Sequence, residues 1–396
     1  MSKQETHQPL RCACRPAPTV LTALASALIL SACGGGSAPE PSQVVASTAQ
    51  SAPAAPAAPA ATAPVVPATP AAPGAQPGKT STATSALATP SVATDTIFAP
   101  TSFWYQPIPA TVALHANSAN FKAEFLRQKA AYYGTVNINT WAYSSPVYTA
   151  DASTPVKQVA FNNCQNKTYP EPALLAQWSA VPIPANAAPA DGTDAEMTVY
   201  QPSTDTLWEF WVARNSNGQW AACWGGRMNN VSTSDGIFPF PYGTTATGLP
   251  FIGGQITAEE LERGEIRHAI GISLVETEAA TIFSWPAKRS DGVNPQNLPN
   301  RIPEGLRFRL DPAIDVDTLP MTTAGKIIAK AAQTYGFVVW DKAGAISLRV
   351  QNPKSYTTLG LTNPYTVLFA GKPSYAVLDG LPWDRLQFLP MNYGKP

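Results

Sequence analysis

The segment of residues 34–96 most limits what this 396-residue chain can fold into. It consists almost entirely of Ala, Pro, Ser, Thr, Gly and Val, and its only charged residues are Glu40, Lys79 and Asp95. Such a segment has no large side chains to bury, so it cannot offset the entropy that ordering would cost. We therefore expect a disordered tether, made semi-extended by its prolines at about 3 Å per residue.

The residues before this tether have the order of an export signal. Basic residues are followed by a short apolar run over residues 20–30 and then by LSAC, which ends at Cys33. The run is too short for a comfortable membrane span. LSAC also resembles a bacterial lipobox, in which the cysteine is diacylated and the preceding residues, here 1–32, are removed. We expect the lipid on Cys33 to anchor the protein in the cell envelope, at an outer membrane or the cell surface. An ordinary secretory signal is the alternative.

Residues 97–396 are the part of the chain that we expect to fold, as a single globular domain. All ten tryptophans lie there, and about 300 residues are enough for a sizeable core. The chain carries 26 Lys and Arg against 26 Asp and Glu, with no basic stripe, which argues against a nucleic-acid partner. Only Cys164 and Cys223 remain after the signal, so in an oxidising compartment we expect one disulfide between them. Free buried thiols are the alternative.

No metal or cofactor is expected from the motifs. The sequence has no CxxC pair, and His115 and His268 are isolated from other ligand-type residues. It also lacks the glycine-rich motifs that bind dinucleotides or phosphates. The acidic run of residues 311–317 offers carboxylate oxygens for calcium, but its spacing is not that of an EF-hand, and a solvated turn is the favoured interpretation.

Short strand-like segments separated by Pro, Gly, Asn and Asp dominate the folded part. The predicted strands cover residues 197–200, 207–214, 219–224, 266–274, 281–285, 306–310, 337–340 and 346–350. Helical patterns are few, and those at 119–133 and 323–335 predict short covering helices. Many short strands without internal repeats or βαβ alternation indicate a mainly β domain, an antiparallel β-sandwich or jelly-roll.

His268 follows a strong local signal. Thr257, with Glu260 three residues later, predicts a capping box and a helix over residues 258–263 that ends at Gly264. In the strand beyond it, alternation sends Ile266, His268, Ile270, Ile272 and Leu274 to one face. His268 is therefore either a core histidine bonded to a backbone carbonyl or a general base at the wet edge of a sheet.

Glu209 is the strongest candidate for an acid. It lies between large apolar residues in LWEFW, residues 207–211, and a carboxylate in such surroundings is either paired or has a raised pKa. The preceding strand begins near Glu196. If the two strands pair in a favourable register, both carboxyls share a groove. Two carboxyls across a groove are the catalytic arrangement of a glycoside hydrolase. The alternative is a buried Glu209 paired with an arginine such as Arg227 or Arg267.

Aromatic residues gather in the same region of the sequence. Flat aromatic faces stack on sugar rings, although large aromatics also dominate the interiors of β-sandwiches. The candidates for substrate binding are Trp208, Trp211, Trp224 and Tyr242. Arg267 is a candidate for steering a charged sugar.

Several short stretches stand out by their order and spacing. They are LWEFW at 207–211, TATGLPFIGG at 245–254, GEIRHAI at 264–270, SWPA at 284–287, IPEGLRFRL at 302–310 and YGFVVWD at 335–341. In these stretches the chain, from about Phe103 onward, resembles a family of exported bacterial proteins of unassigned function. The resemblance implies that Glu209, Arg267 and His268 belong to one recurring constellation, and it implies no catalytic role for them.

Two classes of function follow. The first is a surface-anchored enzyme, a hydrolase or lyase acting on polysaccharide, with Glu209 as acid and His268 or Glu196 as base. The second is a non-catalytic glycan-binding or envelope lipoprotein, in which the same groove holds its ligand without cutting it.

Overall fold

The computed structural model describes residues 96–166 and 171–396. The predicted signal peptide, the lipidation site Cys33 and nearly all of the predicted tether lie outside these residues. Within the described part, no helix has the length and apolar character needed to cross a membrane.

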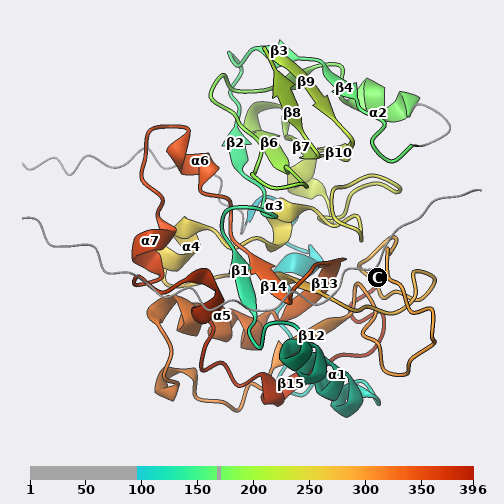
Figure 1. The fold of residues 1–396 in the computed structure, drawn as a ribbon, viewed down its shortest axis with the longest axis vertical. Helices are drawn as coiled ribbons and strands as arrows, with labels where there is room; N and C mark the ends of the chain where they lie inside the picture. The colour runs from blue at the N-terminus through green and yellow to red at the C-terminus, as the bar shows by residue number, and fades with distance from the viewer. Residues whose placement is uncertain (1–95, 167–170) are drawn as a thin grey trace, which may run out of the picture. The chain divides into compact units, whose positions relative to one another are not determined.

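A six-stranded mixed sheet forms the centre of the fold (Figure 1). Its strands, in spatial order, are β1 (Asn137–Asn139), β14 (Ser347–Arg349), β11 (Ile270–Leu274), β13 (Phe337–Lys342), β12 (Arg307–Leu310) and β15 (Leu386–Phe388). The pairs β1–β14 and β11–β13 are parallel, and the remaining pairs are antiparallel.

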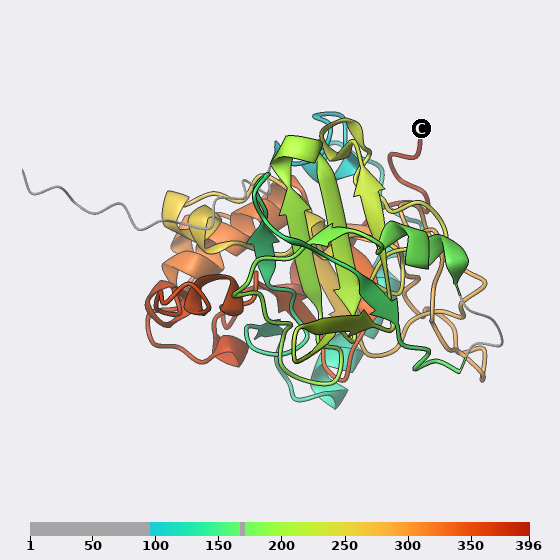
Figure 2. The same cartoon turned by 90° about the horizontal axis from the view of Figure 1, so that it is seen from above.

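A second group of strands, green in Figure 1 and seen from above in Figure 2, is built on a four-stranded sheet. In spatial order it contains β10 (Trp224–Asn229), β7 (Thr206–Trp211), β6 (Met197–Gln201) and β2 (Val147–Thr149). Two smaller sheets accompany it: β4 (Val159–Phe161), β9 (Gln219–Ala222) and β8 (Arg214–Ser216), and the pair β3 (Val156–Lys157) and β5 (Val181–Pro182).

Helices cover these sheets. The two longest are α1 (Ser118–Ala131) and α5 (Thr323–Thr334), which contact β15 and β12 respectively. The shorter ones are α2 (Pro172–Gln177), α3 (Phe251–Gly254), α4 (Ala258–Arg263), α6 (Lys354–Thr357) and α7 (Tyr365–Leu368). Single 3₁₀ turns are η2 (Phe103–Tyr105), η3 (Pro202–Thr204), η4 (Val231–Thr233), η5 (Val316–Thr318), η6 (Ser374–Ala376) and η7 (Trp383–Arg385). Both predicted covering helices are confirmed, as is the capping box of α4, which ends at Gly264 with a φ of 85°.

Among the residues that the structure describes, the core consists of three apolar clusters. One lies on a face of the six-stranded sheet and includes Ile266, Ile270, Ile272 and Leu274, which confirms the predicted alternation. A second contains residues of both large sheets, such as Leu207 and Trp340. The third lies on the other face of the four-stranded sheet.

The prediction of a β-rich fold with few helices is confirmed. The finer prediction of an antiparallel sandwich or jelly-roll is not, because the sheets include parallel pairs. The predicted strand at 281–285 is also wrong, since those residues form turns and irregular backbone. The disulfide between Cys164 and Cys223 is confirmed, with Cα atoms 5.6 Å apart.

Candidate functional site

One face of the six-stranded sheet is polar near β1 and β14. Residues that pair directly across strands point to the same face of a sheet. The pairing of Asn137 with Ser347, Asn139 with Arg349, and Ser347 with Ser273 therefore places these polar residues on one face. The residues between them, such as Ile138, Leu348 and Ile272, point to the opposite face and join the apolar core.

A β-bulge adds Asp341 to this polar face. Ile272 pairs with Val339 but Ser273 pairs with Asp341, so Trp340 is an extra residue in β13. Regular alternation would have sent Asp341 into the apolar core beside Val339. The bulge instead turns it toward Arg349, whose Nη2 donates a hydrogen bond to Asp341 Oδ2 at 3.0 Å. Bulges often re-aim a side chain next to a functional site.

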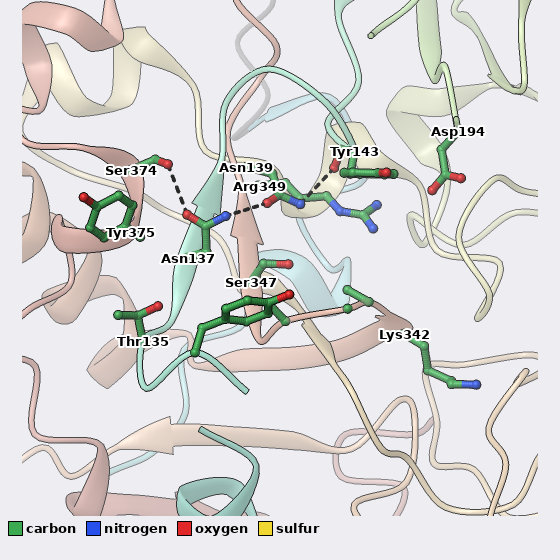
Figure 3. Close-up of a pocket in the computed structure, with 14 residues that line it drawn as sticks. Thr135, Asn137, Asn139, Tyr143, Asp194, Lys342, Ser347, Arg349, Ser374 and Tyr375 are labelled. Carbon is green, nitrogen blue, oxygen red and sulfur yellow. Dashed lines mark hydrogen bonds between the residues drawn. The ribbon is translucent and has the colours of Figure 1, made fainter. Parts of the chain in front are cut away.

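The polar face borders a cavity of about 750 Å³, which Figure 3 shows. Hydrogen bonds fix its wall: Ser374 Oγ donates to Asn137 Oδ1 at 3.1 Å, and Asn137 Nδ2 donates to Asn139 Oδ1 at 3.1 Å. The 3₁₀ turn η6, which packs beside β1, contributes Ser374 and Tyr375. Asp194, from the segment before β6, lines the cavity as well.

A second cavity of about 440 Å³ adjoins the first, and the two share Asp194 and Lys342. Trp211 and Trp224 line it, as do Asp341 and Asp291. The backbone amide of Asp291 donates a hydrogen bond to the buried Glu304 Oε2 at 3.3 Å. Burial, followed by the charge of Asp291, raises the pKa of Glu304 to about 9.

Arg349 is the most unusual side chain of the site. Its side chain is only 2% exposed, and its Cζ lies 4.6 Å from the centroid of the Phe251 ring and 5.4 Å from that of Trp340. Asp341 accepts from Nη2, but Nε and Nη1 have no hydrogen-bond partner in the described chain. Buried donors of this kind are normally satisfied, so two unpaired donors on a residue that lines a cavity are a reason to look for a ligand there.

Glu196 is the matching unsatisfied acceptor. It is fully buried, and neither of its carboxylate oxygens has a hydrogen-bond partner among the described residues. Burial raises its pKa to about 7, an effect that Arg349 opposes and Asp194 reinforces. Burial therefore favours the protonated form of this carboxyl at pH values where an exposed glutamate is ionised.

Glu209 lies in β7, next to β6, and Glu196 directly precedes β6. Glu209 pairs with Thr198, two residues after Glu196. Its surroundings are different, however, because its carboxylate is satisfied. Thr244 Oγ1 donates to Oε2 at 2.6 Å, and the backbone amides of Phe251 and Ile252 donate at 3.1 Å each.

The fully buried Glu209 thus holds the start of α3. Burial raises its pKa to about 7, while these hydrogen bonds oppose the rise. Its partners are a hydroxyl and two backbone amides. They differ from the partner that the alternative prediction named, which was an arginine such as Arg227 or Arg267. We therefore assign it a structural role.

His268 lies in the core, and its predicted role as a general base is not supported. The side chain is 0% exposed, with Nδ1 2.9 Å from the carbonyl oxygen of Ala269 and Nε2 3.0 Å from Glu260 Oε1. Burial by itself would raise the pKa of Glu260, but the charge and hydrogen bond of His268, with hydrogen bonds from Thr257, lower it. The histidine thus ties the capping box of α4 to the strand that follows.

Arg267 does not lie at the cavities. It pairs with Glu265 on the surface, where the two side chains are 52% and 53% exposed. Glu209, His268 and Arg267 therefore have separate partners and do not form the single constellation that the family resemblance implied.

The predicted aromatic residues divide between site and core. Trp211 and Trp224 line the second cavity, and Tyr242 stacks on Trp224 with ring centroids 6.0 Å apart. Trp208 is 4% exposed, belongs to the third apolar cluster and donates its indole N–H to Gln177 O. Trp208 is thus a core residue.

Most residues that line the first cavity were not predicted from the sequence. Asn137, Asn139, Tyr143 and Arg349 were not predicted as site residues, and only the alternation of Ser347, Leu348 and Arg349 could have indicated a strand with one polar face. The acidic run is a structured turn, in which Asp315 Oδ1 accepts from the Asp317 amide. In the described ranges, no group of His, Cys, Asp and Glu side chains is arranged to hold a metal ion.

Comparison with known proteins adds no relative to this description. No family model, no curated protein and no solved structure matches the chain. A function for this protein has to be inferred from the chemistry of the site.

Proposed function

We propose that the protein is a lipid-anchored protein of the cell envelope that binds extracellular polysaccharide in the cavity of Figure 3. The observation that carries the proposal is the combination of exposed tyrosine rings with amide and hydroxyl groups around one hollow. Tyr133, Tyr143 and Tyr375 line it and are 81%, 41% and 56% exposed. Flat rings stack on sugar faces, and amides such as those of Asn137 and Asn139 pair with sugar hydroxyls.

The size and the predicted setting of the cavity agree with this role. Its volume of about 750 Å³ falls in the range of roughly 300–1,000 Å³ that is typical of ligand sites. A lipid on Cys33 and a long tether, both predicted from the sequence, would hold the domain away from the membrane and among external polymers.

Catalysis is a second candidate, favoured by two carboxyls whose pKa values are raised. Burial raises the pKa of Glu196 to about 7 and that of Asp341 to about 6, and Arg349 opposes both shifts. Glycoside cleavage uses one protonated carboxyl as the acid and a second, ionised carboxyl nearby as the base. In a hydrolase or lyase of this kind, Asp341, which lines the second cavity, acts as the base; Glu196 lines neither cavity, so it acts as the acid only if ligand binding exposes it.

The test is a polysaccharide panel with the full-length protein in detergent, measuring both retention and released reducing or unsaturated ends. Tyr375→Ala should weaken retention about 2- to 10-fold, the value of one stacked ring. Phe240→Ala is the matched control, since Phe240 is 68% exposed and does not line this cavity.

The outcomes separate the two candidates. Retention without release identifies a binding protein. Release that is abolished in Glu196→Gln identifies an enzyme. If no polymer in the panel is retained or cut, or if Phe240→Ala weakens binding as much as Tyr375→Ala, the proposed site is wrong.

A further inference from the structure

We infer that the polysaccharide is acidic and that Arg349 binds its anionic group, either the carboxylate of a uronic acid or a sulfate ester. This inference rests on the proposed function and names the class of ligand for the same cavity.

The first support is the state of the Arg349 guanidinium. The residue lines the cavity although its side chain is only 2% exposed. Asp341 is the acceptor for Nη2 alone, and Nε and Nη1 have no partner in the described chain. A planar guanidinium presents several N–H donors in a fixed geometry that suits carboxylate and sulfate oxygens.

The second support is that the guanidinium is held in place before any ligand arrives. The rings of Phe251 and Trp340 lie against it, with centroids 4.6 Å and 5.4 Å from Cζ. Figure 3 shows Arg349 directed toward the side of the cavity where Tyr143 and Asp194 lie. A fixed cation loses little conformational entropy when it binds an anion.

The lining also carries a second cation. Besides Arg349, the lining contains Lys342, whose ammonium donates to the carbonyl oxygen of Asp291 at 3.4 Å. Asp194 is the carboxylate of this lining. Asp341, which accepts from Arg349 Nη2, balances the second cation, so an anion is favoured by charge-assisted hydrogen bonds from the guanidinium and not by a net positive charge.

Glu196 is a charge near Arg349 and not part of the cavity wall, because it is fully buried and lines neither cavity. Arg349 acts electrostatically on this carboxyl, but no ion pair joins the two in the described residues, and each retains polar atoms without partners. An acidic sugar carries an anionic group and hydroxyl groups on one ring. Its anion can accept from Arg349 while its hydroxyl groups pair with amides of the cavity wall, such as those of Asn137 and Asn139.

This assignment moves the recognition of a charged sugar from Arg267 to Arg349. Arg267 was the residue predicted from the sequence for this role, and it is occupied in an exposed pair with Glu265. A surface pair of this kind contributes little and is screened by salt.

The experiment compares matched polymers on the full-length protein in detergent. Polygalacturonate is paired with its methyl ester, and dextran sulfate with dextran, at physiological ionic strength. We expect the charged member of at least one pair to bind about tenfold tighter or more than its uncharged match. The pair that shows the preference decides between carboxylate and sulfate.

Variants then identify the residues that cause the preference for the charged polymer. Arg349→Gln combined with Asp341→Asn removes both members of the buried pair, so no lone charge remains, and it should abolish the preference. Lys342→Gln, on the rim of the cavity, should reduce it even if the double variant fails to fold. Arg267→Gln is the matched surface control and should retain the full preference.

The outcomes distinguish this inference from the proposed function. Equal binding of charged and uncharged polymers overturns the acidic ligand and leaves polysaccharide binding in place. A preference that is lost in Arg267→Gln and retained in the cavity variants also overturns it. If neither member of any pair is retained, the proposed function fails together with the inference.

Discussion

Replacing Glu196 by Gln should stabilise the protein, and the gain should grow with pH. The carboxyl is fully buried, its oxygens lack partners within the described chain, and burial raises its pKa from 4.5 to about 7. Below pH 4.5 the folded and unfolded states are both protonated. As the pH rises toward 7, the unfolded state releases its proton while the folded state retains it, so the free energy of unfolding falls.

The size of the effect follows from that shift. At about 1.4 kcal/mol per pKa unit, ionised Glu196 costs the folded state about 3 kcal/mol at pH 8. Glutamine has nearly the same shape and does not ionise, so the variant avoids this cost. For a domain of this length the gain corresponds to a rise in Tm of roughly 5 °C at pH 8, which shrinks toward zero near pH 4.5.

Differential scanning calorimetry of wild type and Glu196→Gln at pH 4.5, 6 and 8 measures the effect. Glu262→Gln, an exposed glutamate on α4, is the control and should change Tm little at any pH. A Glu196→Gln variant that is less stable than wild type at pH 8, or whose Tm difference does not depend on pH, would show that the carboxylate has a partner and refute the reasoning.

Four further outcomes test other parts of the description. His268→Gln should lower stability by about 1–3 kcal/mol in urea unfolding without weakening polysaccharide retention, and a selective loss of retention would return this residue to the site. Glu209→Ala should cost at least about 3 kcal/mol, because two backbone amides lose their acceptor, and unchanged stability would contradict the structural role. Non-reducing mass spectrometry should find Cys164 joined to Cys223, and reduction should cost about 4 kcal/mol for a sequence separation of 59 residues, whereas full alkylation without reductant would exclude the bond. Cys33→Ser should abolish labelling with palmitate, and continued labelling would rule out the lipobox.

The contrast between Glu196 and Glu209 explains why the site assignment changed. Both are buried glutamates, one in β7 and one directly before β6, and the pKa of each is raised to about 7. Glu209 is satisfied by backbone amides and stabilises the fold. Glu196 and Arg349 retain unpaired polar atoms, which lowers stability without a benefit to the fold itself. Sites where a protein gives up stability in this way are expected to serve function.

Several features of this protein were determined by the sequence alone. The capping box of α4, the helices α1 and α5, and the alternation of Ile266, Ile270 and Ile272 all depend on spacings of a few residues. The disulfide followed from there being only one pairing for the cysteines that remain after the signal. Local spacing fixes which residues share a face of a helix or strand, so these predictions did not require the rest of the fold.

Tertiary structure decided which of those residues form a site. The amides that satisfy Glu209 come from residues 42 and 43 positions later, and the short helix α3 that carries them contains two glycines and has no periodic signal. The bulge at Trp340 reverses the direction of Asp341, which a regular alternation would have buried in the core. Whether a buried polar atom is satisfied depends on neighbours that folding brings from distant parts of the chain, and this is why only the structure could separate Glu196 from Glu209, both predicted from the sequence, and could add Arg349.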